Sequence, residues 1–78
     1  MMEMTTEELT ARDERALAEL WNMLDRYGAI LADEHLNRDH KIGYIVAACM
    51  VDERYHLGWL CNEAAVRLVT EAFHRKGI

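Results

Sequence analysis

Residues 56–59 read His56-Leu57-Gly58-Trp59, and they decide the fold because they interrupt an otherwise helical pattern that runs from Lys41 to Lys76. If Gly58 takes the left-handed conformation that ends many helices, Asn62 would cap a further helix and the fold would be a three-helix bundle. If the helix continues through Gly58, the chain forms an antiparallel helical hairpin. A polar stripe that keeps its phase across Gly58 favours continuity, whereas a helix of about 36 residues would be unusually long. Both arrangements remain open on these grounds.

The part of the chain before this region predicts one amphipathic helix over residues 6–32, in which Gly28 would mark a kink or an early end. The capping box of Thr5 and Glu8 provides its start signal. A polar stretch over residues 33–40 is the expected connection, and Asn37 or Asp39 would cap the helix that follows. The apolar positions of the first helix recur at steps of three and four and share one stripe. The stripe consists of Leu9, Ala16, Leu17, Leu20, Met23, Leu24, Tyr27, Ile30 and Leu31.

Composition agrees with a single all-α domain spanning residues 1–78. The chain has 78 residues, 51% of them hydrophobic and none of them proline, which is too apolar for a disordered tail. Period-two alternation is absent, so no strand is expected. The longest apolar run, Tyr44 to Val51, is far too short to span a membrane, and the acidic first residues lack the apolar segment of a signal peptide. Cys49 and Cys61 both lie in apolar surroundings and are expected to be buried thiols in a reducing cytoplasm.

Charge is unevenly placed along the chain. The net charge is −5, and residues 1–34 hold nine acidic and three basic residues, a net −6. Nucleic-acid binding is not expected, because no basic stripe exists to contact phosphates. In a helix-turn-helix, residues 62–76 would be the recognition helix. Their acidic and basic residues are nearly balanced, so this helix would attract DNA only weakly. Antiparallel packing would bring Arg75 and Lys76 close to the acidic residues at the start of the first helix, which are Glu3, Glu7 and Glu8.

Residues 41–73 carry more apolar surface than the first helix is able to cover. One seam of the segment would pack on that helix, while a second seam keeps near-heptad spacing and has no cover within a hairpin. A homodimer that closes as a helical bundle would bury this second seam. The candidate interface residues of the second seam are Tyr44, Ala48, Val51, Tyr55, Trp59, Val66, Val69 and Phe73.

One cluster suggests an alternative, metal-binding function. Cys49, Glu53 and His56 are spaced i, i+4 and i+7, so on a continuous helix they would share one side. The Glu-x-x-His pattern of Glu53 and His56 resembles the ligand motif of ferritin-like di-iron proteins, which implies a site for iron or another divalent metal. No glutamate of the first helix would face this cluster, so a second subunit would have to supply the other carboxylate.

Other chemistry finds no support in the sequence. The chain has no serine and no glycine-rich phosphate loop, and neither cysteine lies in an electropositive setting. No cofactor and no enzyme activity are therefore expected. The expected function is that of a small acidic protein-interaction module, a regulator or inhibitor of an unidentified protein target. Phage and prophage accessory factors are similar in type, and the comparison extends no further than type.

Overall fold

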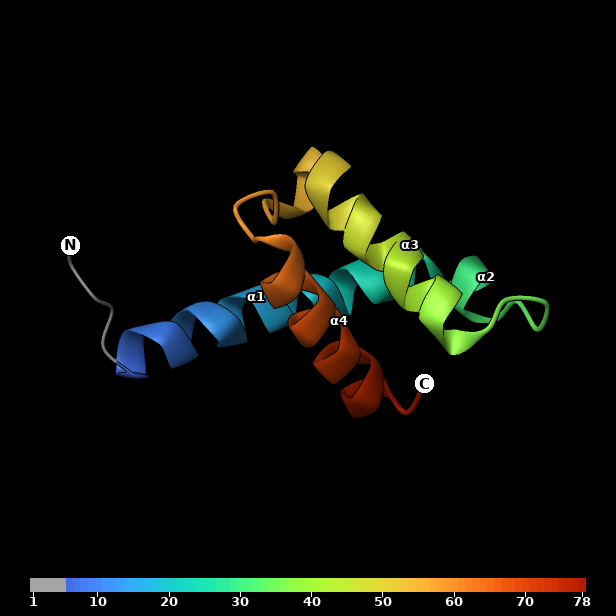
Figure 1. Ribbon diagram of the computed structural model, residues 1–78, viewed down its shortest axis with the longest axis horizontal. Coiled ribbons are helices and arrows are strands. Elements are labelled where there is room, and N and C mark those ends of the chain that lie inside the picture. Colours follow the sequence, from blue (N-terminus) through green and yellow to red (C-terminus); the bar gives the residue numbers. More distant parts are fainter. Residues whose placement is uncertain (1–5) are drawn as a thin grey trace.

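The computed structural model describes the backbone of residues 6–78 and the side chains of residues 11–78. All regular structure in this part of the chain is helical, which confirms the predicted all-α class. The elements are α1 (Thr6–Arg26), a short α2 (Gly28–Leu31), α3 (Arg38–Val51), a 3-10 turn η1 (Glu53–Tyr55) and α4 (Asn62–Lys76). The chain measures 45 × 24 × 19 Å along its principal axes, and α1 lies along the longest of them (Figure 1).

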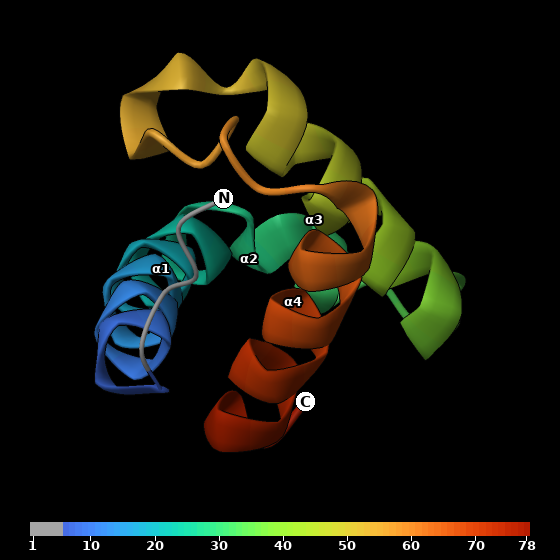
Figure 2. The same cartoon turned by 60° about the vertical axis from the view of Figure 1, so that its left-hand side comes forward.

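The three longer helices do not form a parallel bundle. In Figure 1, α3 runs back against α1, and α4 slopes steeply across α1. Helix α4 packs against both α1 and α3, and Figure 2 shows it between them. Helix α4 is therefore the element that joins the two halves of the core.

The first predicted helix forms, but it divides at Tyr27. Helix α1 ends at Arg26 and α2 begins at Gly28, in agreement with an early end near this glycine. Five residues of the predicted apolar stripe are buried, Ala16, Leu17, Leu20, Met23 and Leu24, whereas Tyr27, Ile30 and Leu31 are only partly buried. Leu9 and the capping box of Thr5 and Glu8 lie outside the described side chains.

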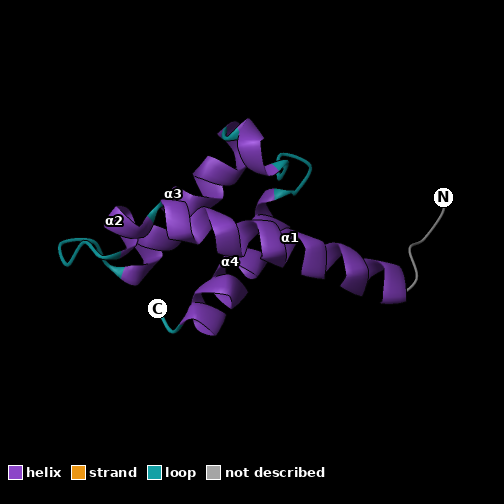
Figure 3. Ribbon diagram, turned by 180° about the vertical axis from the view of Figure 1, so that it is seen from behind, coloured by secondary structure: helices purple, strands orange, loops and turns teal. Residues whose placement is uncertain are grey.

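Helix α3 begins as the sequence predicts. The side chain of Asn37 accepts a hydrogen bond from the backbone N–H of His40 at 2.8 Å, so Asn37 is the N-cap and satisfies one of the unpaired donors of the first turn. The connection before α3 is short and irregular and lies at one end of the molecule (Figure 3).

The prediction of a continuous helix from Lys41 to Lys76 is wrong, because α3 ends at Val51. Asp52 has an extended backbone, with φ −90° and ψ 95°, and its carboxylate accepts a hydrogen bond from the backbone N–H of Arg54. A short side chain that bonds the nearby backbone in this way competes with the helix and favours a turn. The break therefore begins earlier than Gly58.

Two details predicted for this break are also wrong. The left-handed residue is His56, with φ 51° and ψ 39°, and Gly58 has no positive φ. The N-cap of α4 is Cys61, and Asn62 is the first residue of the helix. His, like Asn and Asp, adopts the left-handed region more readily than most residues, so glycine is not required there.

The hydrophobic core takes residues from every longer helix and from the segment between α3 and α4. Tyr55, Leu57 and Leu60 of that segment are buried with the helix residues. Among the described residues no polar or charged residue is buried. The segment between α3 and α4 is therefore held against the core by three apolar side chains, although it lacks regular α-helix.

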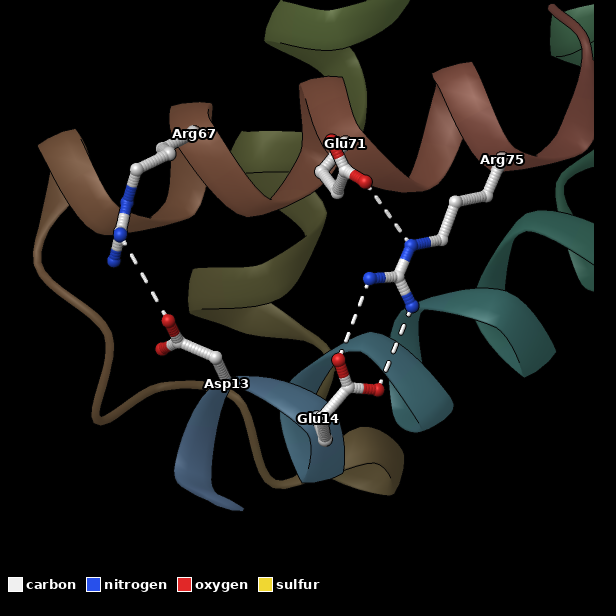
Figure 4. A network of polar contacts seen from close by, with 5 residues as sticks. All are labelled: Asp13, Glu14, Arg67, Glu71 and Arg75. Atoms are coloured by element: carbon white, nitrogen blue, oxygen red, sulfur yellow. Dashed lines mark hydrogen bonds and ion pairs between the residues drawn. The ribbon is translucent and has the colours of Figure 1, made fainter. Parts of the chain in front are cut away.

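Ion pairs line the contact between α1 and α4 (Figure 4). The Arg75 guanidinium reaches Glu14 on α1 at 3.3 Å and Glu71 on its own helix at 3.1 Å, and Arg67 lies 3.8 Å from Asp13. Lys76 pairs with Asp25 near the end of α1. The contact predicted for Arg75 and Lys76 with Glu3, Glu7 and Glu8 involves side chains outside the described residues. Within the described residues, Arg75 pairs with Glu14 and Lys76 with Asp25.

Candidate functional site

The predicted second seam is divided between the core and the surface. The break after Val51 lets α4 fold back against α3, so part of the seam is covered within the chain. Four of its eight residues are buried and cannot form a surface: Ala48, Tyr55, Val69 and Phe73. Four are exposed: Tyr44, Val51, Trp59 and Val66.

One exposed apolar surface lies on α3. Residues 42–51 contain no charged side chain, yet only Ile45, Ala48 and Cys49 among them are buried. The opposite side of the helix is open to solvent, and Val51 retains 77% of its accessible surface. We call this side the α3 face; it consists of Gly43, Tyr44, Ala47 and Val51. Helices that lack a polar side are normally covered, so the α3 face is a candidate for an interface.

Tyr44 links the α3 face to the end of α1. Its ring meets the ring of Tyr27 edge to face, with centroids 6.0 Å apart. The Tyr27 hydroxyl in turn donates a hydrogen bond to Asp52 at 2.9 Å. This bond to a carboxylate, together with partial burial, raises the pKa of the Tyr27 hydroxyl. Tyr27 thus contacts a residue in the middle of α3 and the residue that follows its last turn.

Asp52 and Arg54 form a forked pair at the end of α3. Arg54 donates to the two carboxylate oxygens of Asp52 from Nε at 2.9 Å and from Nη2 at 2.6 Å. These bonds, with a smaller contribution from Tyr27, hold the pKa of Asp52 well below its usual range. Asp52 is therefore a charged acceptor that stabilises the chain reversal. Arg54 and Tyr27 donate its hydrogen bonds.

A second candidate surface is a pocket beside Trp59, between α1 and the segment that follows η1. Its volume is about 380 Å³. Trp59 is 49% exposed, and the guanidinium of Arg12 lies 4.5 Å from the centre of its ring. We call this the Trp59 pocket; it is lined by Arg12, Arg15, Ala16, Glu19, Tyr55, His56, Leu57 and Trp59.

The other side of Trp59 borders a smaller hollow of about 230 Å³. Cys61 and Arg67 line this hollow. The prediction that both cysteines are buried is wrong for Cys61, which is exposed at the start of α4. It is correct for Cys49, where burial raises the pKa of the thiol to about 11 and keeps it protonated and unreactive at neutral pH.

The three candidate metal ligands lie on different parts of the backbone. Cys49 is buried in α3, Glu53 begins η1, and His56 has left-handed geometry, so the shared helix side that the sequence predicted does not exist. Across the described residues, no group of three or more His, Cys, Asp and Glu side chains is placed to hold a metal ion. The ferritin-like motif therefore lacks the helix that would have brought its ligands together.

Helix α4, which a helix-turn-helix would use to read DNA, forms ion pairs with α1. Arg67 and Arg75 of α4 pair with Asp13 and Glu14 of α1, so these two cations are turned toward acidic neighbours within the chain. The arrangement supplies no row of cations along α4 for a phosphate backbone.

Seven residues of the two surfaces were missed at the level of sequence: Gly43 and Ala47 of the α3 face, and Arg12, Arg15, Ala16, Glu19 and Leu57 of the Trp59 pocket. Arg12 and Arg15 belong to the polar side of α1, and nothing in the sequence shows which other segment lies over them. Gly43 and Ala47 could have been found, because residues 42–51 carry no charge. A helix segment without charged positions is apolar on every side, so one of its sides remains uncovered.

Comparison with known protein families, with curated proteins and with solved structures gave no match to this chain. Among the described helices, none combines the length and the hydrophobicity needed to cross a bilayer.

Proposed function

We propose that this chain is a small non-enzymatic protein-interaction module, a regulator or inhibitor that works as a homodimer paired through the α3 face. The observation that carries the proposal is the exposed, charge-free side of α3. Exposed apolar surfaces mark sites of association when they lie on a helix segment that carries no charge.

The shape of the α3 face suits a second copy of the same helix. Gly43 and Ala47 are one turn apart, and a methyl group added at Gly43 would meet no atom within 4 Å. Small residues at the centre of a helix face allow two backbones to approach closely, while Tyr44 and Val51 supply apolar contact on either side. In a two-fold dimer the same patch meets itself, so a patch without charge places no like charges opposite each other in the contact.

The size of the face sets the strength of the expected dimer. A ten-residue helix segment is about 15 Å long. Its exposed side offers less than the roughly 800 Å² per partner of a typical stable interface. We therefore expect a dissociation constant in the micromolar range, which corresponds to about −8 kcal/mol.

Sedimentation velocity between roughly 1 and 200 µM protein tests this dimer, because the range spans the expected dissociation constant. Ala47→Glu places a charge at the centre of the α3 face and should weaken association at least about tenfold. The matched control is Ala18→Glu, which puts the same charge on an exposed position of α1 and should leave association unchanged. Circular dichroism should show equal helix content in both variants.

A wild-type chain that remains monomeric over the whole range would contradict the homodimer. An unchanged dimer in Ala47→Glu, or an equal loss in Ala18→Glu, would remove the α3 face as its interface.

A further inference from the structure

We propose that the Trp59 pocket binds a short acidic segment of a partner protein, with an apolar side chain of that segment placed against the Trp59 ring. This inference rests on the proposed role in protein interaction, but it concerns a different surface from the α3 face and does not require a dimer.

The pocket has the size and the lining of a recognition site. Its volume of about 380 Å³ falls at the lower end of the range for ligand sites, which leaves room for one or two side chains. Tyr55 and Leu57 are buried parts of its wall and belong to the core, so that wall is held by the fold. A binding site on a rigid wall loses less conformational entropy when it is filled.

Trp59 is the expected anchor of the contact. A tryptophan that keeps 49% of its surface in water leaves a large apolar area to be covered. The guanidinium of Arg12 stacks on the ring at 4.5 Å, which restrains the orientation of the ring before any partner arrives. Trp, Tyr and Arg are also the residues that most often carry the binding energy of protein interfaces.

Charge around the pocket selects an acidic partner. Among the described residues that line it, Arg12 and Arg15 are basic and Glu19 is acidic, although the chain as a whole has a net charge of −5. Arg15 is exposed, and it forms no ion pair within residues 11–78. An exposed guanidinium that is not already paired is suited to a forked bond with a carboxylate.

The same charges favour a peptide over a nucleic acid. A long polyanion would be repelled by the acidic remainder of the chain, and Glu19 lies directly in the pocket. A short segment with a few carboxylates beside one apolar side chain avoids most of that repulsion. It also matches the pairing of arginines with an aromatic ring in this pocket.

Selection from a phage-displayed library of random peptides, about twelve residues each, tests the specificity, because such peptides span a pocket of this kind. The wild-type chain should enrich peptides that carry net negative charge and at least one aromatic or aliphatic residue. The most enriched peptide is then synthesised and its dissociation constant measured. Trp59→Ala and Arg15→Glu should each weaken its binding at least about tenfold.

Two variants serve as controls. Trp21→Ala removes the other exposed tryptophan, which lies under Lys76 away from the pocket, and should change binding less than about twofold. Ala47→Glu alters only the α3 face and should bind the peptide as the wild type does, whether or not the wild type dimerises. The homodimer proposal and the peptide-binding proposal are therefore tested independently, and either one can be contradicted without the other.

Four results would overturn the inference. They are a selection that yields no binder, enriched peptides that are neutral or basic, retention of binding in both Trp59→Ala and Arg15→Glu, and tighter binding of a single-stranded oligonucleotide than of the peptide. Arg15→Glu keeps the test decisive if Trp59→Ala does not fold.

Discussion

At the residue scale, the conformation of His56 decides how the chain leaves η1. Its φ of 51° places a residue with a Cβ atom in the left-handed region, and it is the one non-glycine residue with positive φ in the described chain. Such a conformation costs about 1 kcal/mol for most residues. Burial of Tyr55 and Leu57 on either side of His56 offsets this cost by holding the turn against the core.

Substitution of His56 should therefore separate backbone strain from side-chain contacts. His56→Gly should stabilise the fold slightly, by about 0.5 kcal/mol, because relief of the strain exceeds the added entropy of the unfolded chain. His56→Val should destabilise it by about 1 to 2 kcal/mol, since a β-branched residue is a poor fit to this region. Urea unfolding measures both, and a loss of stability in His56→Gly would show that the imidazole, and not the backbone, holds the turn.

At the scale of elements, the end of α3 is held by the local bonds of Asp52 with Arg54 and also by a residue from a distant part of the sequence. Tyr27, at the junction of α1 and α2, donates its hydroxyl to Asp52, which Arg54 also holds. The contact joins the end of α1 to the first residue after α3 and stabilises the position at which the helix stops. A helix that continued past Val51 would lose both the turn at Asp52 and this bond.

Tyr27→Phe removes only the hydroxyl of this contact. We expect a loss of about 1 kcal/mol in the free energy of unfolding, because one hydrogen bond to a charged acceptor disappears while the ring still packs on Tyr44. Tyr44→Phe is the matched control: Tyr44 is exposed, and the edge-to-face contact of its ring with Tyr27 survives. Thermal unfolding compares the two, and equal effects would contradict a structural role for the bond to Asp52.

At the scale of the whole molecule, burial and not the surface ion pairs holds the three longer helices together. The pairs of Arg67 with Asp13 and of Arg75 with Glu14 are largely exposed, and exposed pairs contribute at most about 1 kcal/mol each. The buried residues, by contrast, are all apolar, and Phe73 of α4 is completely inaccessible to solvent. Because α4 contacts both α1 and α3, a change at its buried side affects the whole core.

Phe73→Ala should cost about 3 to 5 kcal/mol, which is a large part of the stability expected of so small a domain. We expect this variant to be partly or fully unfolded at 25 °C by circular dichroism. Val66→Ala shortens an exposed side chain of the same helix and should change the stability by less than about 0.5 kcal/mol. A Phe73→Ala chain as stable as the wild type would mean that α4 is not the centre of the core.

Local patterns predicted those features that depend on local interactions. The apolar stripe of α1, the early end near Gly28, the cap at Asn37 and the all-α class all follow from contacts within one or two helical turns. The candidate surfaces were predicted only in part, because Tyr44, Val51, Trp59 and Val66 are exposed whereas the other four seam residues are buried.

What the sequence determined by itself is therefore which residues are helical and which side of α1 is apolar. The tertiary structure decided that the second half of the chain reverses after Val51, since Tyr27 reaching Asp52 and the burial of the segment before α4 add to the local turn that Asp52 makes with Arg54. The reversal in turn divided the apolar surplus of residues 41–73 between core and surface. Helical periodicity records spacing along one element, whereas burial depends on which other element lies opposite, and no local pattern carries that information.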